Sequence, residues 1–103
     1  MSWLLLLLAG LFEIAWALGL KYSEGFTRLW PSVVTVCALI ASLTLLGLSL
    51  RQLPLGTAYA VWSGIGALGT VTLGVLLFGE SVSPLRLVSV GFILIGIAGL
   101  KLA

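Results

Sequence analysis

Hydrophobic residues fill four long stretches of the chain, and polar residues gather in the short segments between them. The stretches cover about residues 3–20, 32–50, 57–78 and 84–101. At ~1.5 Å of rise per residue, a helix of about 17 to 22 residues spans the ~30 Å hydrocarbon core of a bilayer. The pattern therefore predicts four transmembrane helices.

Turn-forming and charged residues separate the four stretches. Pro31, Pro54 and Pro84 lie at or just before predicted helix starts, where the missing N–H costs little because it has no partner in the helix. The intervening segments are too short to form a soluble domain. We therefore expect residues 1–103 to form a single four-helix transmembrane domain, an all-α integral membrane protein.

Composition narrows the classes of function. Only 8% of the residues are charged and 61% are hydrophobic, against a usual charged share of about 25%, which excludes a soluble globular domain. The chain has no His and a single cysteine, Cys37, so it has neither an imidazole nor a thiolate cluster for catalysis or metal binding. We expect no enzyme activity, no cofactor and no metal. The five Lys and Arg residues are scattered, so nucleic acid is not an expected partner.

The basic residues are almost balanced across the membrane. Four helices place both termini on one side, here called side A, with Arg51 and Lys101. Side B carries Lys21, Arg28 and Arg86. Because orientation follows the bias of Lys and Arg in the loops, this small bias predicts insertion both ways round and an antiparallel homodimer of dual topology. The alternative is that the first helix alone sets one orientation.

Glu13 is the only acidic residue near the middle of a predicted span. A charged carboxylate at that depth costs about 2.5 to 3.5 kcal/mol on translocon scales, so it faces protein or a water-filled cavity and marks a functional site. No Lys or Arg at that depth neutralises Glu13. The alternative is a protonated glutamic acid that joins two helices by a hydrogen bond.

Aromatic and hydroxyl side chains are the predicted companions of Glu13. Trp16 shares its helix face, and the other candidates for binding substrate and protons are Ser42, Tyr59, Trp62 and Ser63. A carboxylate with aromatic faces attracts a cation, each good face adding about 0.5 to 2 kcal/mol, and a guanidinium ion matches its edge with two parallel hydrogen bonds. Two alternatives remain open: Tyr59 as an interfacial belt residue, and Trp62 as ordinary packing.

Glycines suggest close packing of the helices. Gly64, Gly66 and Gly69 formally match the dinucleotide fingerprint G-x-G-x-x-G, but no strand precedes them and they lie inside an apolar span. With Gly10, they instead predict close helix packing and a hinge. A face without polar residues in the last predicted helix suggests the dimer interface, with Gly91, Leu94, Ile95 and Gly99.

Longer motifs resemble a known family. The motifs are Gly10-x-x-Glu13-x-x-Trp16-Ala17, Lys21-Tyr22-Ser23-x-Gly25-Phe26-Thr27-Arg28, Ser42, and Leu53-Pro54-x-Gly56-Thr57-Ala58-Tyr59-Ala60-x-Trp62-x-Gly64-Ile65-Gly66-Ala67. Over essentially its whole length, the chain resembles the small multidrug resistance transporters. Trp16, together with Leu39 where the multidrug subtype tends to carry an aromatic residue, favours the guanidinium exporter subtype. Ser63 stands where that subtype more commonly has Thr.

The resemblance implies a fold and an activity. It implies an antiparallel dual-topology dimer in a bacterial inner membrane that exchanges protons for guanidinium and related small cations, including substituted ones, with proton and cation competing for Glu13. It also implies that Trp16, Ser42, Tyr59 and Trp62 shape the site. The alternatives are a broader exporter of quaternary ammonium cations and, from a different class, a membrane scaffold subunit that does not transport.

Overall fold

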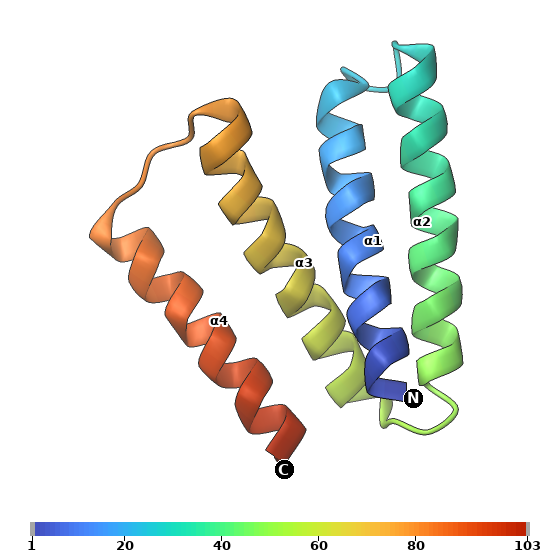
Figure 1. Cartoon of the computed structure of the whole chain (residues 1–103), viewed down its shortest axis with the longest axis vertical. Coiled ribbons are helices and arrows are strands. Elements are labelled where there is room, and N and C mark those ends of the chain that lie inside the picture. Colours follow the sequence, from blue (N-terminus) through green and yellow to red (C-terminus); the bar gives the residue numbers. More distant parts are fainter. Residues whose placement is uncertain (1, 103) are drawn as a thin grey trace.

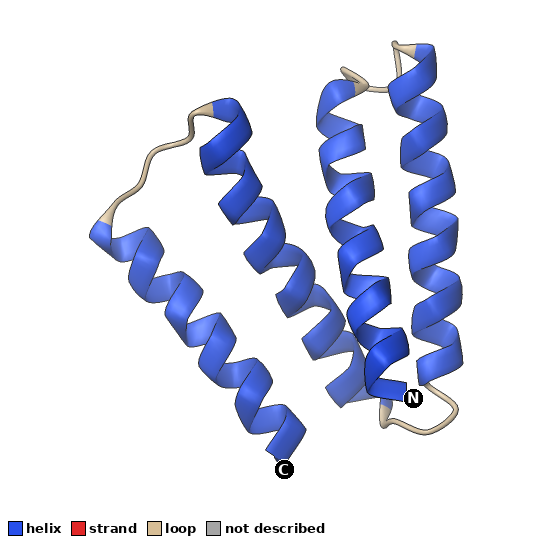
Figure 2. Ribbon diagram, in the orientation of Figure 1, coloured by secondary structure: helices blue, strands red, loops and turns tan. Residues whose placement is uncertain are grey.

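The computed structural model describes residues 2–102, which form four α-helices and no strand (Figures 1 and 2). The helices are α1 (Ser2–Tyr22), α2 (Leu29–Ser49), α3 (Leu55–Phe78) and α4 (Pro84–Leu102). All four are long and apolar enough to cross a membrane. The predicted all-α, four-helix architecture is confirmed.

Helix ends differ from the predicted boundaries where side chains or backbone geometry extend a turn. α2 begins at Leu29, so Pro31 lies in its first turn, where the N–H groups lack helical partners in any case. α1 continues to Tyr22. Just beyond it, the hydroxyl of Ser23 donates a hydrogen bond to the Leu20 carbonyl (2.7 Å) and accepts one from the Phe26 N–H (3.1 Å). α3 ends at Phe78, and the Gly79 that follows has a left-handed φ of 64°, which suits a residue without a Cβ.

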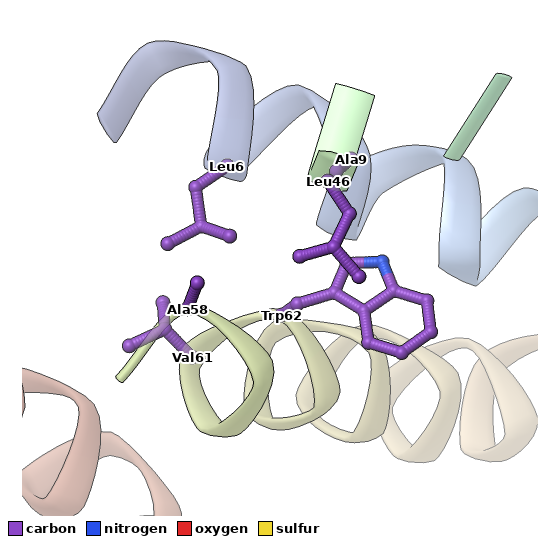
Figure 3. Packing of buried hydrophobic residues seen from close by; sticks show 6 residues of the cluster. All are labelled: Leu6, Ala9, Leu46, Ala58, Val61 and Trp62. Atoms are coloured by element: carbon purple, nitrogen blue, oxygen red, sulfur yellow. The ribbon is translucent and has the colours of Figure 1, made fainter. Parts of the chain in front are cut away.

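The core of the protomer lies between α1, α2 and α3. Figure 3 shows side chains of α1 and α2 pointing toward α3. The buried cluster consists of Leu6, Ala9, Leu46, Ala58, Val61 and Trp62. α1 and α3 run in the same direction, and they diverge from this core toward the end of the molecule where both helices finish (Figure 1). The start of α1 and the end of α4 both lie at the opposite end (Figure 1).

α4 lies at the edge of the protomer. It packs mainly on α3, where Ile93 and Ile97 lie close to Gly64, and none of its residues is buried. Near its end, the Lys101 ammonium also lies 5.7 Å from the centre of the Trp3 ring of α1. Leu94 and Ile95 are 56% and 69% exposed. Those two residues, with Gly91 and Gly99, were predicted to form a dimer interface, which stays a prediction.

Candidate functional site

The carboxylate of Glu13 lies between α1 and α3. It packs against Gly66, where an added Cβ would contact the Glu13 carboxyl carbon and lie 2.5 Å from Oε2. Any larger residue at position 66 would therefore have to displace the carboxylate. Glycine at this position of α3 lets the two helices approach while a polar group lies between them.

Two polar atoms in this region lack partners. Glu13 Oε2 and Trp16 Nε1 are buried, and neither has a hydrogen-bond partner among the described residues. A buried polar atom left unsatisfied costs about 1 to 3 kcal/mol. The Glu13 oxygen accepts hydrogen bonds and the indole N–H donates them. The Glu13 oxygen thus keeps an unused acceptor position in this conformation.

A chain of hydrogen bonds joins the three core helices. The indole N–H of Trp62 in α3 donates to the hydroxyl of Ser42 in α2 (2.9 Å), and that hydroxyl donates to the Ala9 carbonyl of α1 (2.7 Å). The single proton of the Ser42 hydroxyl is therefore used within the protein, which leaves Ser42 only an acceptor lone pair for other groups. In this conformation the side chains of Ser42 and Trp62 hold the three core helices together.

The remaining predicted site residues lie on α3. The ring of Tyr59 lies 5.5 Å from the ring of Trp62, with the two planes at 53°, and Tyr59 is 56% exposed. Ser63 is half-buried. The structure thus brings Ser42, Tyr59 and Trp62 into one contacting group, and it places Glu13 and Trp16 on α1.

The predicted packing glycines all lie close to side chains of neighbouring helices. Gly10 of α1 meets Ile65, and Gly69 of α3 meets Ile14. An added Cβ at residue 64 would lie 2.9 Å from Ile97 of α4. These glycines allow short distances between α1, α3 and α4.

Sequence reasoning missed the Ala9 carbonyl as the end of the hydrogen-bond chain. It also missed a contact between Gly74 and Glu80, where an added Cβ would lie 2.6 Å from the carboxylate. A backbone carbonyl leaves no mark in a sequence. No spacing of residues signals the second contact, because Glu80 lies beyond the end of α3.

Comparisons with known proteins identify the family. A family model described as Small Multidrug Resistance protein matches residues 1–94. The chain is similar over its full length, covering 98% of each relative, to proteins named guanidinium exporter from Citrobacter freundii (59% identical), Salmonella typhimurium strain LT2 (56%) and Escherichia coli O6:H1 (57%). The resemblance seen in the motifs is confirmed. The chain belongs to the small multidrug resistance family of transporters, as a multi-pass protein of the bacterial inner membrane.

Proposed function

We propose that this protein is a proton-coupled antiporter that exports guanidinium and related guanidinyl cations, and that it is not an enzyme. The observation that carries the proposal is the buried Glu13 carboxylate oxygen, which has no hydrogen-bond partner among the described residues. The relatives that are 59% identical and named guanidinium exporter support the choice of cation.

The chemistry is binding without covalent change. A guanidinium ion is planar and carries N–H donors in a rigid fork, so it can give a carboxylate two parallel hydrogen bonds. A proton bound to Glu13 removes the negative charge and one acceptor position. Proton and cation therefore exclude each other at the same group, and that exclusion couples the two fluxes.

Alternating access requires a second wall for the site. One four-helix chain is too small to form all the walls of a site that opens in turn to each side of the membrane. An inverted copy gives two inverted repeats around a midplane site, an arrangement in which one conformation and its counterpart exchange open faces. The exposed apolar face of α4 supports a homodimer, and the near balance of basic residues supports its antiparallel form.

A second candidate function is export of quaternary ammonium cations. The observation that favours it is the exposed ring of Tyr59 beside Trp62, because aromatic faces attract cations that have no N–H donor. A non-transporting scaffold has less support. A role in joining helices would require a hydrogen bond from Glu13 to another helix. Glu13 Oε2 forms none within the described part of the chain.

Proteoliposomes of the purified protein test these candidates. In the proposed dimer, two protons or one cation occupy the pair of Glu13 carboxylates, so the exchange moves net charge and a guanidinium exporter gives a current when guanidinium is added. A broader exporter also responds to tetraalkylammonium ions, and a scaffold responds to neither. Glu13→Gln serves as the matched variant because it keeps the shape of the side chain and removes its charge. We expect Glu13→Gln to assemble normally and to transport nothing. Proton-driven guanidinium flux through this variant contradicts the competition mechanism.

A further inference from the structure

A second carboxylate lies in the same groove as Glu13. The Glu80 side chain folds back onto Gly74, where an added Cβ would lie 2.6 Å from Oε1. Gly66, beneath Glu13, and Gly74, beneath Glu80, belong to the same helix, α3. Because they are eight residues apart, they lie on one face about two turns from each other. Both carboxylates thus rest on a glycine of one groove.

A pocket of about 130 Å³ connects Glu80 with the groove between α1 and α3. Its lining includes Ala17 and Lys21 of α1, Thr70 and Gly74 of α3, and Glu80. Ala17 and Lys21 continue the α1 face of Glu13 in steps of one turn. The pocket therefore lies on the same side of the two helices as Glu13. Lys21 is displaced from Glu13 by ~12 Å along α1, toward side B.

Glu80 already holds a guanidinium group. Arg86, in the first turn of α4, places one terminal nitrogen 3.0 Å from Glu80 Oε1. The contact is single, and the side chains of Arg86 and Glu80 are 35% and 46% exposed. An exposed ion pair of this kind contributes about 0 to 1 kcal/mol, so the Arg86 guanidinium exchanges easily with a competitor of the same chemistry.

The surrounding positive charges weaken the binding of a cation at Glu80. The Lys21 ammonium lies 5.7 Å from the centre of the Phe78 ring and lines the same pocket as Glu80. With Lys21 and Arg86 present, one carboxylate faces two cationic side chains. A carboxylate next to two cationic side chains binds a further cation weakly and releases it readily. Weak binding suits a site that the transported ion occupies only briefly.

We propose that Glu80 is an outer binding site for guanidinium-class cations, at which the transported ion takes the place of the Arg86 side chain before or after it occupies Glu13. This inference rests on the proposed function. It assigns opposite roles to two residues that form one ion pair: Glu80 holds the cation and Arg86 competes with it.

Because the two residues have opposite roles, substituting each of them should have opposite effects on guanidinium binding. In proteoliposomes, the guanidinium concentration that gives half the maximal current should rise about two- to five-fold in Glu80→Gln, the effect of losing an exposed ion pair. The same concentration should fall in Arg86→Gln, because the internal competitor is gone. If the ion pair only holds the 79–83 segment to α4, both substitutions break the same contact and shift the value in the same direction.

Two control variants separate local binding from surface charge. Glu24→Gln and Arg28→Gln remove one charge of each sign from the 23–28 segment, on the same predicted side of the membrane, and neither residue lines the pocket. We expect both controls to match the wild type. The proposal is overturned if the half-maximal guanidinium concentration of Glu80→Gln equals that of the wild type, or if it shifts in the same direction in Glu80→Gln and Arg86→Gln. It is also overturned if a control variant shifts as far as the pocket variant of the same charge. A wild type without any guanidinium current overturns the proposed function itself, together with this site.

Discussion

The indole N–H of Trp62 donates a hydrogen bond to the Ser42 hydroxyl, which lies 2.9 Å away and in turn donates to the Ala9 carbonyl. These contacts link α3, α2 and α1 at a point where Ser42 is fully buried and Trp62 is 7% exposed. Buried polar groups that satisfy one another fix a single arrangement of the side chains. Trp62, which the sequence predicts as a site residue, is thus held in place by the protomer core.

Ser42→Ala should destabilise the protomer by about 1 to 3 kcal/mol, because it leaves the buried Trp62 N–H without an acceptor. Thermal unfolding in detergent measures the loss as a lower midpoint. In a Trp62→Phe background, which has no indole N–H, the same substitution should cost less, so a double-mutant cycle should show coupling. Additive effects of the two substitutions would show that the hydrogen bond contributes little.

Gly66→Ala should abolish or strongly reduce guanidinium transport, because the added methyl group occupies the position of the Glu13 carboxylate. Gly47→Ala is the matched control, since nothing lies within 4 Å of an added Cβ at that helical position. Transport by the Gly47 variant should equal that of the wild type. Normal transport by Gly66→Ala would show that the close approach of Glu13 to α3 is not needed for function.

Apparent affinity for guanidinium should increase with pH. The cation binds the deprotonated carboxylate of Glu13, and the proton competes for it. Raising the pH removes the competitor and lowers the half-saturating concentration, by at most about tenfold per pH unit for each competing proton. Equilibrium binding titrations at several pH values measure this dependence. An affinity that stays constant from pH 6 to pH 9 contradicts competition at Glu13.

Three lysines added on side A, beside Arg51, should force a single orientation in the membrane. This variant alone should then lose transport, because an antiparallel dimer needs both orientations. Co-expression with a variant biased to the opposite orientation should restore it. Full activity from a population with one orientation would refute the antiparallel dimer, and the Glu13 site would still stand.

Hydropathy and composition were enough to predict that the chain lies in a lipid bilayer and that it forms four helices. Four apolar stretches of membrane-spanning length can satisfy their backbone groups in lipid only as helices or in a closed barrel, and helices form over nearly the predicted ranges. The sequence also singles out Glu13, since a lone ionisable group near mid-membrane is too costly to occur without a role. Its motifs indicated the family, which the comparisons confirmed.

Packing between helices set the contacts that no periodicity reveals. Composition does not indicate that the Ser42 hydroxyl bonds the Ala9 carbonyl, because any helix turn offers a similar carbonyl. Nor does chain order predict that Glu80 folds back onto Gly74. That contact depends on the left-handed turn at Gly79, after which the Glu80 N–H donates a hydrogen bond to the Gly74 carbonyl (3.3 Å). Local sequence sets which faces are apolar, whereas the register of one face against another depends on the simultaneous fit of side chains from distant segments.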